Sequence, residues 1–356
     1  MKTCEISRAD SAGRAKNYVH YLSVLKCAGM LAVIGIHVLN APVTYWHEHF
    51  TSVELFFDFF VKNVLVCWAV PVFVMTSGAL FLGRRTEIRK MWGKYILRLM
   101  LSLLTFGTLF ALMEIVFDAR TFAPAMILSA LRRMLAGESW DHLWFVYMCI
   151  GLYIITPPLQ RMLGAVDGGS LKYLLAVLVV FTCLVPAVDG ITGVKFGVYI
   201  PASGIWIFYY LMGYALHNEL IRIDTRMCAA FIVIGVTWCS LGQLLPDMRD
   251  FYGAQLKYAR PEGVIGVMMS LAVFSLVKSK CAETTDFLDT AVNPLTFGVY
   301  VVHAFFINLM YKVLHFTPER VNAFLMWAVV YTVTLFFSLG AVWLMRKIPF
   351  VRKRIL

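Results

Sequence analysis

Ten long apolar stretches follow one another along the chain and constrain its fold more than any other feature. Each is close to the roughly 20 residues that a helix needs to cross a hydrocarbon core about 30 Å thick. Hydrophobic residues fill 60% of the 356 positions and charged residues only 15%. A soluble core of this size cannot enclose that much apolar side chain, which excludes an ordinary soluble enzyme, a nucleic-acid-binding module and a disordered chain. The stretches cover roughly residues 18–40, 58–82, 95–117, 142–163, 171–189, 203–218, 227–246, 262–278, 293–314 and 323–345.

These stretches predict an all-α, polytopic membrane protein of about ten transmembrane helices. Strands are not expected, because an open sheet edge cannot be hydrogen-bonded in lipid and no alternation with a period of two runs through the segments. With the N-terminus inside, the inner segments carry 21 of the 32 lysine and arginine residues. Basic residues collect in cytoplasmic loops, so this bias predicts that both termini are cytoplasmic.

The chain is expected to hold a single membrane domain. Residues 18–345 form it, between an N-terminal cytoplasmic tail at 1–17 and a basic cytoplasmic C-terminal tail at 346–356. The outer loops between the third and fourth spans and between the seventh and eighth are too short for a soluble domain. The eight cysteines show no C-x-x-C spacing. We interpret them as buried hydrophobic residues and predict no metal site.

Ionisable residues inside the predicted spans are the strongest functional signal. A charge at mid-bilayer costs about 2.5–3.5 kcal/mol and usually faces a protein-lined cavity. Lys26 and His37 lie eleven residues apart in the first span. Eleven residues are close to three helical turns, so both side chains lie on one stripe of the helix, about 16 Å apart along its axis. This arrangement predicts a polar channel along the first span. The alternative is that Lys26 extends to the inner headgroups and His37 sits at the outer interface.

Other candidates carry less weight on their own. His303 lies about 15 Å deep in the ninth span, where a hydrogen bond across helices is the ordinary explanation. The dense basic segment from Arg84 to Arg98 could bind an anionic cytosolic substrate. It is equally explained as cytoplasmic charge that orients the neighbouring spans in the membrane. His142 and Trp144 open the fourth span, where interfacial aromatic rings are expected whatever the function. No phosphate-binding glycine loop, serine nucleophile elbow or H-E-x-x-H motif occurs.

Four segments, taken in order, resemble the membrane acyltransferase-3 family of bacterial O-acyltransferases. Residues 21–26 followed by His37 resemble its signature of a basic residue, ten positions and a histidine. Residues 70–82 resemble its "FF-x-I-S-G-(F/Y)-L" stretch. Residues 142–147 resemble the "HLWF" form of the subgroup related to the enterobacterial-common-antigen O-acetyltransferase, and residues 298–303 resemble "S-x-x-x-Y-x-x-H". The resemblance extends over the whole chain.

The sequence departs from the family pattern at three positions. Lys26 stands where the family usually has arginine, which keeps the charge but loses the planar guanidinium. The arginine pair after the second span is Tyr95-Ile-Leu-Arg98 here, one arginine short. Cys149 stands where a glutamate is often found, as expected for the "HLWF" subgroup.

The resemblance implies a membrane O-acyltransferase, and specifically an O-acetyltransferase of the bacterial inner membrane. Its donor would be acetyl-CoA from the cytoplasm, with no permanently bound cofactor. Its acceptor would be a hydroxyl of a cell-envelope glycan or glycolipid. Besides these two and the lipid bilayer it implies no nucleic-acid partner, and it leaves homo-oligomerisation open.

The resemblance also implies roles for particular residues. His37 is expected to act as general base toward the acceptor hydroxyl, or to carry the acyl group itself. Lys26 is expected to stabilise the thioester carbonyl oxygen or a phosphate of the carrier. Arg98, with Arg84 and Arg85, is expected to hold the carrier's phosphates. The residues expected to line the substrate cavity are Trp144, Tyr147, Tyr300 and His303.

Two other functions stay open. A transporter or flippase for a sugar-lipid or small anion would use Lys26 and His37 as a proton or anion path. Its usual signs, internal repeats and paired Gly/Pro interruptions of the spans, are not evident. A structural subunit of an envelope-polysaccharide assembly would keep the fold without the catalytic activity. This function stays open because Lys26 and Tyr95 stand where the family has arginine.

Overall fold

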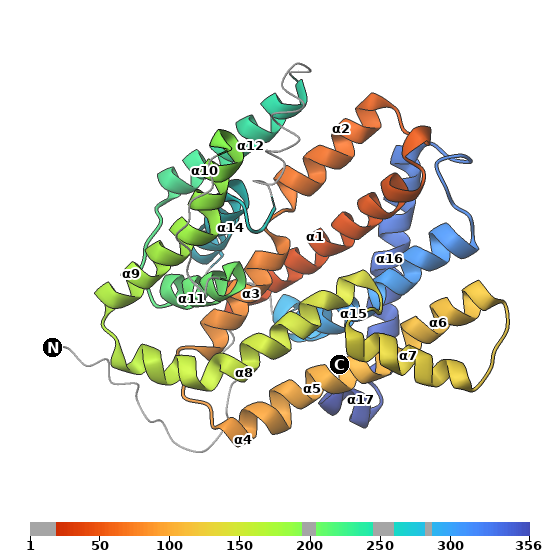
Figure 1. Ribbon diagram of the computed structural model, residues 1–356, viewed down its shortest axis with the longest axis horizontal. Helices are drawn as coiled ribbons and strands as arrows, with labels where there is room; N and C mark the ends of the chain where they lie inside the picture. Colours follow the sequence, from red (N-terminus) through yellow and green to blue (C-terminus); the bar gives the residue numbers. More distant parts are fainter. Residues whose placement is uncertain (1–18, 194–203, 245–259, 282–286) are drawn as a thin grey trace.

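The computed structural model describes residues 19–193, 204–244, 260–281 and 287–356. Throughout these ranges all regular structure is helical and no strand forms, which confirms the predicted all-α class (Figure 1). Among them, seven helical segments are long and apolar enough to cross a membrane. They are His20–Tyr45, Ser52–Phe81, Ile88–Ala119, Asp141–Ala165, Gly168–Gly190, Leu288–Val313 and Ala323–Met345.

The three remaining predicted stretches fall on shorter helices. These are α11 (Ile205–His217), α12 (Thr225–Leu244) and α14 (Val264–Lys280). Each of the three lies beside a range that is not described. The described part therefore holds seven helices that are long and apolar enough to span a membrane, and a helix lies at every one of the ten predicted stretches.

Most spans join α-helix to short π- or 3-10-helical turns. The other α-helices are α1 (His20–Tyr45), α2 (Ser52–Phe60), α3 (Ala69–Phe81), α4 (Ile88–Lys90), α5 (Leu97–Ser102), α6 (Thr108–Ala119), α7 (Ala125–Ala136), α8 (Trp144–Ala165), α9 (Gly168–Val179), α10 (Val185–Thr192), α15 (Thr296–Asn308), α16 (Ala323–Met345) and α17 (Pro349–Arg354). The turns are η1 (His47–His49), η2 (Val61–Leu65), η3 (Met91–Ile96), η4 (Leu103–Gly107), η5 (Asp141–Leu143), η6 (Val180–Leu184), η9 (Leu288–Val292), η10 (Asn293–Leu295) and η11 (Leu309–Val313).

Two spans begin six or seven residues before their apolar stretches. Helix α2 begins at Ser52 because a capping box precedes it, in which Thr51 and Glu54 each accept the other's backbone N–H through their side chains. The third span begins at Ile88 because its basic residues are good helix formers and continue the helix beyond the apolar segment. Hydrophobicity marks the part of a helix that lies in lipid, and the caps mark where the helix itself begins.

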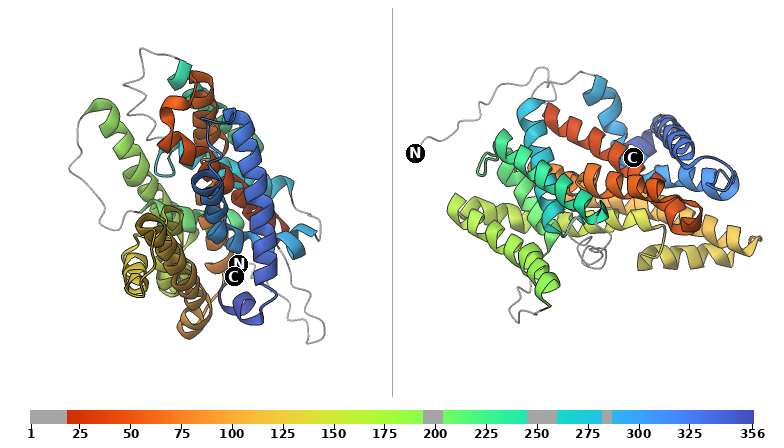
Figure 2. Two further views of the ribbon diagram at one scale, coloured as in Figure 1. Left: turned by 90° about the vertical axis from the view of Figure 1, so that its right-hand side faces the viewer. Right: turned by 90° about the horizontal axis from the view of Figure 1, so that it is seen from above.

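Helix α1 lies in the interior of the bundle. It contacts α3, α14, α15 and α16, and Figure 1 shows these helices around it. Helices α6 and α7 pack against each other at one end of the molecule (Figures 1 and 2). The central position of α1 means that side chains on its opposite faces meet different helices.

The predicted C-terminal tail folds back onto the membrane domain. It contains α17, which contacts α5, and it buries Ile355 and Leu356 in the main core. The Arg346 guanidinium donates a hydrogen bond of 2.7 Å to the Leu356 carbonyl. This contact holds Arg346 at the end of α16, beside the helices that form the site.

Helices α3 and α11 cross with their backbones in direct contact at two glycines. A Cβ added at Gly78 would lie 1.9 Å from the Tyr210 carbonyl oxygen, and one at Gly213 would lie 2.0 Å from the Met75 carbonyl oxygen. Small residues at such crossings let helix backbones pack directly in a membrane, where the hydrophobic effect does not drive helix association. The crossing positions α3, which carries part of the inner cavity described below.

Replacing Gly78 with alanine is expected to destabilise the fold, because the new methyl group collides with rigid backbone. Overpacking of this kind costs about 1–3 kcal/mol, which should lower the midpoint of thermal unfolding in detergent by about 5 °C or more. Gly151→Ala is the matched control, because nothing lies within 4 Å of a Cβ at that helical position. Equal midpoints for the two variants would contradict the close crossing.

Candidate active site

A cavity of about 470 Å³, here called the inner cavity, opens beside the predicted cytoplasmic end of α1. Three cationic side chains line it: Lys26 from α1, Arg98 from α5 and Arg346 from the end of α16. None of the described residues that line it carries a carboxylate. Cations that share a cavity whose lining holds no carboxylate form a site for an anionic ligand.

The arginines of the inner cavity are incompletely paired. The Arg98 guanidinium lies 5.5 Å from the centroid of the Phe297 ring, and its Nε is buried without a hydrogen-bond partner in the described structure. Burial and the neighbouring charge of Arg352 lower the pKa of the Arg346 guanidinium. The unpartnered Nε–H of Arg98 is a donor available to an oxygen-rich ligand, and the arginine charges favour an anion.

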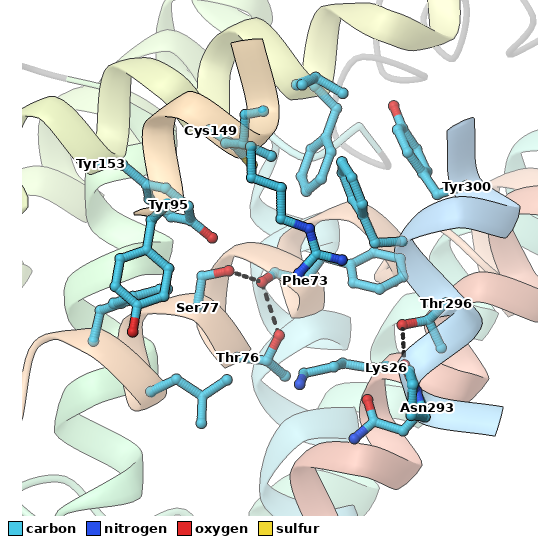
Figure 3. Close-up of a pocket in the computed structure, with 18 of the residues that line it drawn as sticks. Lys26, Phe73, Thr76, Ser77, Tyr95, Cys149, Tyr153, Asn293, Thr296 and Tyr300 are labelled. Carbon is cyan, nitrogen blue, oxygen red and sulfur yellow. Dashed lines mark hydrogen bonds between the residues drawn. The ribbon is translucent and has the colours of Figure 1, made fainter. Parts of the chain in front are cut away.

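Hydroxyl groups and a thiol complete the inner cavity (Figure 3). The Thr76 and Ser77 hydroxyls donate to the Phe73 carbonyl at 2.8 and 3.0 Å, which fixes their hydrogens on the backbone of α3. Lys26 extends toward them in the figure, and Cys149 faces the same space from α8. The oxygens of Thr76 and Ser77 are therefore available as acceptors near the Lys26 ammonium.

A second cavity, of about 590 Å³ and here called the outer cavity, lies toward the other end of α1. His37 and Asn40 line it from α1, and Asp141 and His142 line it from η5. Its lining is mainly polar, with both signs of charge; the other charged residues are Glu114, Arg133, Glu138 and Lys312, of which Glu114 and Arg133 pair at 3.2 Å. Amides, carboxylates and the Trp140 ring give this cavity many groups that bind hydroxyls.

Three histidines from three different elements meet between the two cavities. The ring centroids of His37 (α1) and His303 (α15) are 5.1 Å apart, and those of His142 (η5) and His303 are also 5.1 Å apart. His37 and His142 are separated by 6.1 Å. The His142 Nε2–H donates to the Val301 carbonyl at 3.0 Å, and the His303 Nδ1–H donates to the Tyr300 carbonyl at 2.6 Å. The described residues hold no group of three or more His, Cys, Asp or Glu side chains placed to bind a metal ion.

The predicted channel along α1 is divided in this structure. Lys26 opens into the inner cavity and His37 into the outer one. Tyr300 lines the inner cavity and donates its hydroxyl to the carbonyl of His142, which lines the outer cavity. The described structure thus shows two separate cavities where the sequence predicted one polar channel along α1, with the contact between α15 and η5 lying between them.

The structure separates the predicted site residues into groups. Lys26, Arg98 and Tyr300 line the inner cavity and His37 the outer one, whereas His303 lines neither and is fully buried behind His37. Arg84 and Arg85 are exposed beyond the inner cavity. The Arg84 guanidinium lies 4.9 Å from the centroid of Phe81, which does line that cavity.

Two residues predicted for the substrate cavity lie outside both cavities. Trp144 is 45% exposed and packs against Trp206, with the ring centroids 5.3 Å apart. Tyr147 donates its hydroxyl to the Met134 carbonyl of α7. The reason is helical geometry: at about 100° per residue, neither position shares the face of α8 that follows His142.

Two residues line the cavities without having been predicted as site residues: His142 in the outer cavity and Arg346 in the inner one. His142, Val146, Cys149 and Tyr153 follow one another by four, three and four residues, which places them on one stripe from the outer cavity to the inner. That spacing is visible in the sequence and would have separated His142 from its exposed aromatic neighbours. Arg346 gave no such signal, because its place depends on the fold-back of the chain after α16.

Comparison with protein families identifies one matching family model, described as an acyltransferase domain, over residues 19–346. The matched range begins just before α1 and ends at Arg346, so it contains every residue of both cavities. No curated protein and no solved structure matches the chain.

Labelling of Cys149 is expected to report the charge of the inner cavity. In a variant that retains only this cysteine, a negatively charged thiosulfonate reagent should react about tenfold faster than a positively charged one, after normalisation to free cysteine, because the three cations concentrate anions. Lys26→Gln should reduce that preference. The matched control retains only Cys239, which is buried in α12 away from both cavities and should react with neither reagent.

A preference for the positively charged reagent, or equal rates for both, would contradict an anion-binding inner cavity. Reagent added to sealed vesicles of known orientation also tests the topology, since we expect reaction from the cytoplasmic side only.

Proposed function

Because the chain belongs to the acyltransferase-3 family and is a multi-pass membrane acyltransferase, we propose that it is an O-acetyltransferase of the bacterial inner membrane. It transfers the acetyl group from cytoplasmic acetyl-CoA to a hydroxyl of a cell-envelope sugar or glycolipid. The observation that carries this proposal is the pairing of a cationic inner cavity and a histidine-lined outer cavity on one helix, α1.

The inner cavity supports acyl-CoA as the donor. Coenzyme A carries several phosphate charges, and arginine binds phosphate oxygens through paired N–H donors. Arg98 and Arg346 line the cavity from two different helices, and Lys26 lines it from a third. In the proposal these cations hold the carrier, and the exposed Arg84 and Arg85 extend the cationic surface beyond the cavity.

The outer cavity supports a hydroxyl-rich acceptor. Asn40, Asn308 and Glu138 present amide and carboxylate groups there, and Trp140 presents an aromatic face. Sugar hydroxyls both donate and accept hydrogen bonds, so a lining that holds both kinds of partner suits them. The mixed charge of the cavity gives no reason to expect a strongly anionic acceptor.

The proposed reaction uses His37 as a general base. Its neutral imidazole takes the proton of the acceptor hydroxyl while that oxygen attacks the thioester carbonyl carbon. The new C–O bond forms, the C–S bond breaks, and the proton passes from the imidazolium to the departing thiolate, which leaves as the free thiol of coenzyme A. Lys26 stabilises negative charge on the donor, either on a phosphate or on the carbonyl oxygen.

The proposal also requires the two cavities to communicate during transfer. The thioester arrives through the inner cavity, whereas His37 faces the outer one. Between them lies the contact of the Tyr300 hydroxyl with the His142 carbonyl. In the proposal this contact opens so that the carbonyl carbon can reach the acceptor hydroxyl.

Replacing His37 with alanine is expected to abolish most of the transfer. With radiolabelled acetyl-CoA, purified protein in detergent and an envelope glycolipid extract as acceptor, kcat for release of coenzyme A should fall about 100-fold or more, the usual contribution of a general base. His47→Ala is the matched control, an exposed histidine of η1 outside both cavities. Both variants should unfold at the wild-type temperature.

Unchanged thioester cleavage in the folded His37→Ala protein would contradict the proposal. Uptake of a labelled sugar-lipid or anion into liposomes without cleavage would instead support the transporter.

A further inference from the structure

The His303 Nε2 in the histidine cluster is buried and has no hydrogen-bond partner among the described residues. The His303 Nδ1 lies 2.6 Å from the Tyr300 carbonyl oxygen, and a carbonyl only accepts, so Nδ1 carries the ring proton. In the neutral ring Nε2 is then a bare acceptor. It is buried, and no described residue gives it a hydrogen bond. Buried polar atoms are almost always paired, so an unpaired one calls for a specific explanation.

Only one of the neighbouring rings has an N–H to offer this nitrogen. The neutral ring of His142 has a single N–H, on Nε2, and it is committed to the Val301 carbonyl at 3.0 Å. His37 makes no hydrogen bond within the described part of the chain. Its ring centroid is 5.1 Å from that of His303, with the ring planes tilted by 48°. The two rings are not hydrogen-bonded as they stand, but two imidazoles joined by one N–H···N bond of about 3 Å have centroids about 5 Å apart, so rotation of the rings is enough to form that bond.

We infer that His303 is a positioning residue that accepts a hydrogen bond from His37 and so fixes the tautomer of the base. With one nitrogen of His37 bonded to His303 Nε2, its other nitrogen is bare. His37 lines the outer cavity, so that bare nitrogen is the one that meets an acceptor hydroxyl. The inference rests on the proposed function, because it assigns His303 a part in the same base catalysis.

The arrangement follows the general design of an activated base, in which a third group orients the base that touches the substrate. His303 also stabilises the imidazolium that forms when His37 takes the hydroxyl proton, since its lone pair then faces a cation. The proton stays on His37, because His303 already holds its own proton on the Tyr300 carbonyl. Complete burial of the His303 side chain keeps water from competing for this hydrogen bond.

Two substitutions of His303 test the role of its Nε2 acceptor separately from the role of its Nδ1–H donor. His303→Gln reaches the position of Nε2 and can place an amide oxygen there. His303→Asn is shorter and can only replace Nδ1, so it keeps a donor for the Tyr300 carbonyl and removes the acceptor. We expect His303→Asn to lower kcat about 100-fold with the KM for acetyl-CoA changed less than about threefold, and His303→Gln to recover to within about tenfold of wild type.

His315→Asn is the matched control. His315 is exposed and has a positive φ of 49°, a conformation that asparagine adopts readily, so we expect wild-type kcat. Equal losses in His303→Asn and His303→Gln, or wild-type kcat in both, would overturn the inference. A wild-type protein that does not cleave acetyl-CoA at all would instead overturn the proposed function.

A spectroscopic measurement on the wild-type protein decides the matter if the His303 variants do not fold. Solid-state NMR of ¹⁵N-histidine-labelled protein in lipid should show an N–H···N contact between His37 and His303, with Nε2 of His303 unprotonated. A protonated Nε2 on His303, or no contact between the two rings, would overturn the inference. This result does not depend on the reaction that the protein catalyses.

Discussion

Lys26 and His37 enter the membrane interior on the same helix, and the free-energy cost of an ionisable group in hydrocarbon requires other helices to enclose them. Helices α3, α5, α8 and α15 contribute the walls around Lys26. Helices α6, α7 and α15 and the turn η5 contribute to those around His37. Helix α1 is thus central in the bundle because its two ionisable side chains must be enclosed by other helices. The two cavities are the places where that enclosure leaves room for a ligand.

Polar contacts to backbone carbonyls hold this enclosure together. Tyr300 donates to the His142 carbonyl, and His142 donates to the Val301 carbonyl, so α15 and η5 are tied to each other in both directions. Tyr311 donates to the Val38 carbonyl at 2.9 Å and joins the end of the ninth span to α1. Such bonds, with glycine crossings like that of α3 and α11, replace the hydrophobic effect as the source of helix association in lipid. The same contacts fix the histidine rings relative to one another.

Much of this arrangement could be predicted from local patterns in the sequence. Apolar length predicts the helical class, and the spacing of Lys26 and His37 predicts their common face on α1. What depends on several helices at once could not be predicted. The division of the channel arises where α15 meets η5, and Arg346 reaches the inner cavity only because the chain folds back after α16. Trp144 resembled a site residue because it lies in the same motif as His142, yet the two leave opposite sides of the helix.

The central claim is that the two cavities are the two halves of one transfer path along α1. The most direct measurement is an experimental structure of the protein in lipid nanodiscs with a non-hydrolysable acetyl-CoA analogue. The account predicts analogue phosphates within hydrogen-bond distance of Arg98 or Arg346. It also predicts that the carbonyl lies beside His37, with the Tyr300 hydroxyl displaced from the His142 carbonyl. Phosphates bound away from the inner cavity, or a carbonyl that stays below an intact Tyr300–His142 contact, would contradict it.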